Sequence, residues 1–120
     1  MEKYRGSYLG TEIDETWWRR YRGDGFLARG AGEYWFDETA LCFQRYLTRS
    51  PLCIPYARVV QIKTGTWHAG TWRLGAPIVK VIWVGSDQTL SSGLIVARDE
   101  RQVRAFIDEL SRRVAAARTQ

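Results

Sequence analysis

The sequence predicts a mainly β domain, of the β-rich α+β class, in which about seven antiparallel strands precede one C-terminal helix. Residues from about 25 to 97 are rich in β-branched and aromatic residues that alternate with polar ones, which is typical of strands. Gly, Pro, Asp and Ser residues break this region at short intervals, as tight turns require. Helical periodicity begins only after residue 99. This order favours a bent antiparallel barrel, closed at one end by the helix, over an alternating α/β fold.

The helix is expected over residues 100–117. Asp99 precedes it and is a good N-cap, and the basic residues near its end favour the negative pole of the helix dipole. Its apolar residues follow helical spacing and form a single face: Val103, Phe106, Ile107, Leu110 and Val114.

The clearest strand covers residues 78–84, a β-branched and aromatic run that ends at a turn over residues 85–88. An alternating run over residues 89–96 follows, so we expect a hairpin that leads directly into the helix. Upstream, shorter strands are expected over residues 33–36, 41–47, 52–56 and 59–64.

Residues 1–24 are expected to form an N-terminal extension packed on a domain that spans residues 25–120. Within this extension, residues 15–22 fit neither the helical nor the strand period. A short helix and an edge strand therefore both remain open for this segment.

The composition is that of a chain that can build its own core, because 45% of its 120 residues are hydrophobic. No apolar run approaches the ~20 residues of a membrane-spanning helix. The N-terminus lacks the apolar stretch of a secretory leader, so we expect a cytoplasmic protein. Cys42 and Cys53 are then expected to be buried free thiols. Their spacing from His68, the only histidine, matches no zinc site, so we expect neither a metal nor a cofactor.

The net charge of +5 lies mostly in the middle of the chain, because residues 1–24 and 99–120 are nearly balanced. Most of the cations are Arg, which suits bidentate and stacking contacts. An excess of this size permits an anionic partner without requiring one. No motif of the common nucleic-acid-binding modules is present, so nucleic-acid binding is not expected.

The segment over residues 66–75 holds the first candidate contact surface. Trp67, His68, Trp72 and Arg73 occur there among glycines. Trp and Arg concentrate binding energy at interfaces, so these four residues are expected to anchor a partner. The alternative is a connection between strands, in which both Trp residues cover the rim of the barrel while His68 faces water or caps a carbonyl group.

The second candidate surface is Trp17, Trp18, Arg19 and Arg20. Adjacent Trp residues cannot both be buried on one face of a helix or strand. One of them is therefore expected to be exposed or to contact another chain. The arginines also permit contact with anionic lipid, which the preceding acids at residues 12, 14 and 15 would weaken.

Catalysis is not expected from this sequence, and no catalytic residue is assigned. His68 has no carboxylate or thiol close to it in the sequence, and a general base needs a second group to orient it. Residues 91–93, Ser-Ser-Gly, fall in a strand and not on the sharp strand-to-helix turn that exposes a nucleophile.

Three stretches give the chain a resemblance to the bacterial pleckstrin-homology-like domains, which share their fold with GRAM domains. Residues 32–43 look like the opening hairpin of that family, and residues 52–59, Leu-Cys-Ile-Pro-Tyr-Ala-Arg-Val, are similar to its Ile-Pro-Tyr step after the third strand. Residues 80–94 with the 100–117 helix look like its closing strands and lid.

The resemblance implies a PH-like barrel that serves as a binding module for phosphoinositides, peptides or neighbouring proteins. Phosphoinositide binders of the family use basic residues in the first hairpin, where this chain has Asp37 and Glu38. We therefore expect a non-enzymatic binding or scaffold module that contacts a protein partner or a second copy of itself. The alternative is a peripheral module for anionic membrane surfaces.

Overall fold

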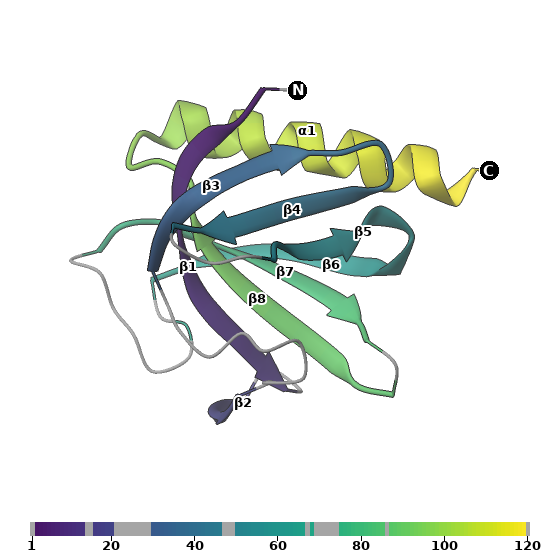
Figure 1. Ribbon diagram of the computed structural model, residues 1–120, viewed down its shortest axis with the longest axis horizontal. Coiled ribbons are helices and arrows are strands. Elements are labelled where there is room, and N and C mark those ends of the chain that lie inside the picture. The colour runs from purple at the N-terminus through teal and green to yellow at the C-terminus, as the bar shows by residue number, and fades with distance from the viewer. Residues whose placement is uncertain are drawn as a thin grey trace.

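The computed structural model describes residues 2–13, 30–46, 50–66, 68, 75–85 and 87–119, together with the backbone of residues 16–20. The described part holds eight strands, one 3₁₀ turn and one α-helix (Figure 1). They are β1 (Tyr4–Ile13), β2 (Thr16–Arg20), β3 (Gly30–Phe36), β4 (Ala40–Arg45), β5 (Leu52–Pro55), the 3₁₀ turn Tyr56–Arg58, β6 (Val59–Gly65), β7 (Ile78–Val84), β8 (Thr89–Ile95) and α1 (Glu100–Arg118). The predicted mainly β class with one C-terminal helix is confirmed.

All strands join one antiparallel sheet in the order β5-β4-β3-β1-β8-β7-β6, and β2 pairs with β1 outside this path. β1 lies in the middle, where it pairs with β3 on one side and with β8 on the other. The predicted boundary after residue 24 assigns β1 to an N-terminal extension packed on the domain. The structure places β1 at the centre of the sheet. β1 was missed because Gly6, Gly10 and the charged residues interrupt its apolar pattern.

The sheet curves around one core. β5 and β6 form its two edges, yet they are separated in sequence only by the single 3₁₀ turn. One hydrophobic cluster contains Leu52 and Ile54 from β5 together with Val59, Val79 and Val81 from β6 and β7. The two edges therefore enclose the same core, although no strand ladder joins β5 to β6 in the described residues.

The helix covers one end of this curved sheet (Figure 1). Asp99 caps it as predicted, because its side chain accepts a hydrogen bond of 2.8 Å from the Arg101 amide. The buried residues of α1 are four of the five expected, and Ile107 is half-buried. They enter the main core cluster, which fixes the face of the helix that meets the sheet.

A network of hydrogen-bonded polar side chains crosses the core between β1, β8 and β7. The Thr11 hydroxyl contacts the hydroxyls of both Tyr8 and Ser92, the latter at 2.7 Å. The Trp83 indole N–H donates to the same Ser92 hydroxyl at 3.0 Å. Buried polar groups are tolerated when they bond one another. This network therefore fixes the register of three neighbouring strands at the position where β1 is irregular.

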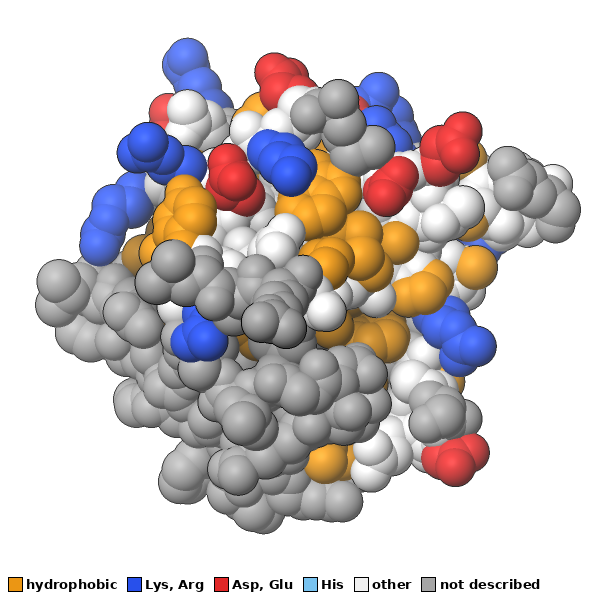
Figure 2. All heavy atoms as spheres, in the orientation of Figure 1, with side chains coloured by type: hydrophobic (Ala, Val, Ile, Leu, Met, Phe, Trp, Pro, Cys, Tyr) orange, Lys and Arg blue, Asp and Glu red, His pale blue; other side chains and the backbone are white. Residues whose placement is uncertain are grey.

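Cys42 and Cys53 form a disulfide, so the prediction of two free thiols is wrong. The two residues lie directly opposite each other in β4 and β5, with 4.1 Å between their Cα atoms. Hydrophobic side chains gather over β3, β4 and β5 on the outward face of the sheet (Figure 2). Cys42 packs there with Trp35 and Ala40 in a second buried cluster. Disulfides are rare in reducing compartments, and the cytoplasmic location stays a prediction.

Reduction of the disulfide is expected to lower the free energy of unfolding by about 3 kcal/mol, because a cross-link closing a loop of roughly this size restricts the unfolded chain. Urea denaturation followed by Trp fluorescence, with and without dithiothreitol, measures the difference. The Cys42→Ala, Cys53→Ala double variant is the control, and its midpoint must not respond to dithiothreitol. Two reactive thiols in the unfolded but unreduced protein would contradict the pairing.

Candidate functional site

His68 is the one residue of the first predicted contact surface that the structure describes, and it is buried. Its exposed fraction is 1%. Trp67, Trp72 and Arg73 lie outside the described residues. The histidine ring is therefore not presented to a partner at the surface. It fits the alternative interpretation, in which the side chain bonds a carbonyl group.

The position of His68 depends on an irregularity in β1. The pairing of β1 with β8 shifts between Tyr8 and Thr11, and Gly10 adopts a φ of 97°, a conformation that favours glycine. His68 Nε2 donates a hydrogen bond of 2.8 Å to the Gly10 carbonyl. The ring also lies against Gly93 of β8, where an added Cβ would come within 2.6 Å of His68 Cγ. His68 thus docks on the outer face of the β1–β8 pair.

The fold brings His68 close to a carboxylate that sequence reasoning missed. Glu12 Oε1 lies 3.7 Å from His68 Nδ1, and Glu12 is itself buried. The two residues are 56 positions apart in the chain, so no local motif could reveal the pair. Because both side chains are enclosed, a substrate has no direct access to them. The expected lack of enzymatic activity stays a prediction.

The second predicted surface lies on β2. Its backbone forms a strand that pairs with the end of β1, which agrees with the edge-strand alternative for this segment. The side chains of Trp17, Trp18, Arg19 and Arg20 lie outside the described part of the chain. Their role as a contact surface stays a prediction.

A groove lies between α1 and the adjoining ends of β1 and β3, and we call it the helix groove. Its volume is about 710 Å³. The N-terminal end of β1 lies beside α1, at the end of the sheet that the helix covers (Figure 1). Gln102, Ala105 and Glu109 line it from the helix, and Val96 lines it from the segment that follows β8.

Four aromatic rings line the helix groove. Tyr4 stacks on Tyr34 with 5.3 Å between the ring centroids. Phe106 meets the Tyr34 ring edge-on at 5.2 Å and the Phe36 ring at 5.4 Å. Tyr34 and Phe106 are buried, whereas Tyr4 is 42% exposed. The groove thus has a fixed aromatic floor and one ring that remains open to solvent.

The Tyr34 hydroxyl stays protonated at ordinary pH. Burial, with a smaller contribution from the neighbouring Tyr4, raises the pKa of Tyr34 to about 12. A neutral phenol can donate a hydrogen bond. The aromatic floor therefore carries a hydrogen-bond donor and no negative charge.

Three cationic side chains line the helix groove: Lys3, Arg5 and Arg113. Lys3 Nζ lies 4.6 Å from the centroid of the Trp35 ring, and the Arg113 guanidinium lies 5.1 Å from that of Phe36. Contacts of this kind orient a cation over an aromatic face. One acid, Glu109, lies among them.

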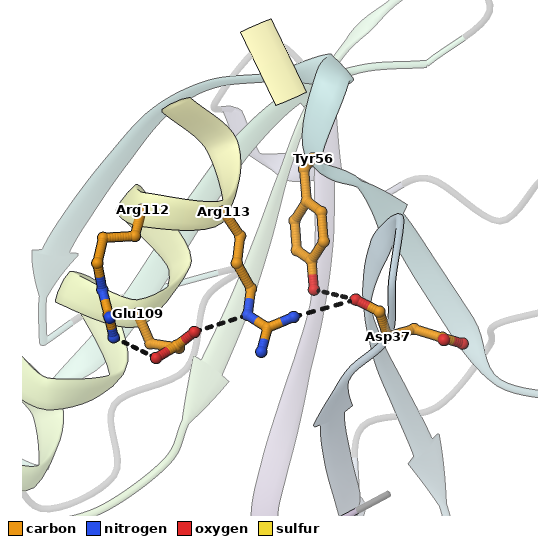
Figure 3. Close-up of polar contacts among 5 residues, drawn as sticks. All are labelled: Asp37, Tyr56, Glu109, Arg112 and Arg113. Carbon is orange, nitrogen blue, oxygen red and sulfur yellow. Dashed lines mark hydrogen bonds and ion pairs between the residues drawn. The ribbon is translucent and has the colours of Figure 1, made fainter. Parts of the chain in front are cut away.

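Arg113 also fastens the helix to the turn between β3 and β4 (Figure 3). Its Nε donates to Glu109 at 2.7 Å, and a terminal nitrogen donates to the Asp37 carbonyl at 3.3 Å. The Tyr56 hydroxyl donates to the same carbonyl at 2.7 Å. Arg112 contacts the other carboxylate oxygen of Glu109. The bond to Glu109 raises the pKa of Arg113, so the charge on this arginine persists at every accessible pH.

A second, shallower hollow of about 630 Å³ adjoins the helix groove. Arg5 and Val96 line both, so the two hollows meet at these residues. Tyr46, which is exposed, and Arg98 lie in the second hollow. The described surface therefore offers a continuous path with aromatic and cationic side chains along it.

The sequence contains only a weak signal for the helix groove. Tyr4, Tyr34 and Phe106 come from three distant segments, and their proximity follows from the central place of β1. One local pattern does indicate aromatic residues at this end of the sheet. The alternation of Tyr34 and Phe36 on β3, next to the apolar helix face, would place two rings at one end of the sheet.

The described residues offer no metal site, and the sequence matches no family model. No group of three or more His, Cys, Asp or Glu side chains in the described residues could hold a metal ion. The described helix is not long and apolar enough to cross a bilayer. The chain matches no protein-family model, and no curated protein has a significantly similar sequence.

Arg113→Ala is expected to lower the free energy of unfolding by about 1–2 kcal/mol, because it removes hydrogen bonds that tie α1 to the β3–β4 turn. Arg112→Ala is the matched control. Its side chain is 72% exposed and contacts only Glu109 among the described residues, so a change within about 0.5 kcal/mol is expected. Urea denaturation measures both variants. An equal decrease in the free energy of unfolding for the two variants would contradict the role given to Arg113.

Proposed function

We propose that the chain is a PH-like domain that acts as a non-enzymatic binding module, and that its partner is a protein segment held in the helix groove. The open, aromatic groove between α1 and the ends of β1 and β3 is the observation that carries the proposal. Specific binding surfaces combine buried aromatic anchors with a polar rim.

The architecture supports the PH-like assignment. The first strand is central, the last strand lies beside it, and the strand order runs from β5 at one edge to β6 at the other. The curved sheet surrounds one core, and the C-terminal helix packs against its end. These features agree with the bent barrel and helical lid that the sequence resemblance implies.

The exposure of Tyr4 supports a role in binding. A tyrosine that is 42% exposed, stacked on a buried ring and flanked by cations, leaves apolar area uncovered at a fixed position. Preorganised aromatic side chains bind with little loss of conformational entropy. The helix groove therefore favours a protein partner over a diffuse contact with a membrane.

The proposal can be tested by selection of a random 12-residue phage-displayed peptide library against the whole chain. Peptides are expected to be recovered, and Tyr4→Ala is expected to weaken their binding at least tenfold, because it removes the open ring of the groove. Fluorescence anisotropy with labelled synthetic copies measures the affinity.

Val84→Ala is the matched control, because Val84 is similarly exposed but lies on β7, away from the groove. The affinity of the Val84→Ala variant for the recovered peptides should equal that of the unmodified chain. Failure to recover peptides, or recovery of peptides that bind the Tyr4→Ala variant equally well, would contradict the proposal. Salt-sensitive flotation with anionic vesicles, lost in Tyr4→Ala, would support the membrane alternative instead.

A further inference from the structure

We infer that the helix groove recognises an acidic peptide segment that carries at least one aromatic or large aliphatic side chain. The inference rests on the proposed function and specifies the chemistry of the partner. It follows from three features of the groove: where its apolar area is open, how its charges are balanced, and how those charges are distributed.

The apolar feature is the space beside Tyr4. Tyr34 and Phe106 are held edge-on to each other, and Tyr4 covers one face of Tyr34. Ala105 lines the facing side of the groove from α1, and its small side chain leaves room between the helix and Tyr4. A ring or a branched aliphatic side chain can stack there against Tyr4, the arrangement that aromatic pairs prefer.

The charge balance of the groove favours an anion. Lys3, Arg5 and Arg113 line it, and Glu109 is the one acidic side chain among its lining residues. Both oxygens of that carboxylate are already in contact with arginines, one with Arg112 and the other with Arg113. Glu109 therefore repels a ligand carboxylate less than an unpaired acid would. Beyond the rim, Glu2 accepts a hydrogen bond from the Tyr4 hydroxyl.

The distribution of the cations favours separate carboxylates over one phosphate group. Lys3 is held over Trp35, and Arg113 is held by Glu109 and the Asp37 carbonyl, so these two cations are anchored at different places. Arg5 lies where the groove meets the second hollow, in which Arg98 adds a further charge. A single phosphorylated headgroup needs donors that converge on it. A peptide with several acids matches a row of spaced cations.

The Tyr34 hydroxyl adds a polar contact at the floor. It is protonated, and it makes no hydrogen bond to another described residue. It can therefore donate to a carbonyl or a carboxylate of the bound segment. At the groove, β1 pairs with β3, and its pairing with β8 begins only at Ser7. The recognition inferred here is through side chains.

The test uses the recovered library peptides. We expect Asp and Glu, together with Phe, Trp, Tyr or Leu, to exceed their frequencies in the unselected library. For the three most enriched peptides, replacement of every Asp by Asn and every Glu by Gln should weaken binding at least tenfold. An increase from 50 to 500 mM NaCl should weaken the acidic versions by a similar factor and the neutral versions far less, because salt screens exposed charges.

A paired substitution locates the effect on the chain. Lys3→Ala combined with Arg5→Ala should reduce affinity for the acidic peptides about tenfold, whereas Arg104→Ala, an exposed cation on α1 that does not line the groove, should leave it unchanged. Recovered peptides that lose binding in Tyr4→Ala but are neutral or basic, or that bind equally well after neutralisation, would overturn this inference and leave the proposed function intact. Absence of any peptide sensitive to Tyr4→Ala would overturn both.

Discussion

The packing of α1 against one end of the curved sheet is the contact on which the rest of the structure depends. Val103, Phe106, Leu110 and Val114 are buried there in the same cluster as residues of β1 and of β3 to β8. Each such side chain contributes about 1.5–3 kcal/mol when it is fully buried. The sheet alone would expose its core at this end, so the helix both completes the core and forms one wall of the groove.

The groove is a consequence of how the helix is held. Arg113 joins α1 to the β3–β4 turn, and Arg118 joins the last turn of α1 to the Val59 carbonyl at 2.6 Å. These contacts fix the C-terminal half of the helix near the edges of the sheet. Its N-terminal half faces Tyr4 and Tyr34 at the beginning of β1 and in β3, and the uncovered space there is the site.

The local patterns of the chain predicted the helix, its cap and most of the strands, because these depend on spacing within a few residues. Three features depend on contacts between distant segments and were not predictable in this way. The central position of β1 requires β3 and β8 on either side of it. The disulfide requires Cys42 and Cys53 to be in register across two strands. The burial of His68 requires the irregularity at Gly10, which releases a carbonyl group toward it.

The most direct test of the packing of α1 against the sheet is a nuclear Overhauser spectrum of the aromatic protons in the whole chain. We expect cross-peaks between the Phe106 ring and the rings of Tyr34 and Phe36, since the centroids are 5.2 and 5.4 Å apart and many of their protons are closer. Tyr4 should show cross-peaks to Tyr34. If Phe106 showed cross-peaks to neither ring while the Tyr4–Tyr34 contact was present, the helix would not lie at this end of the sheet and the groove would not exist.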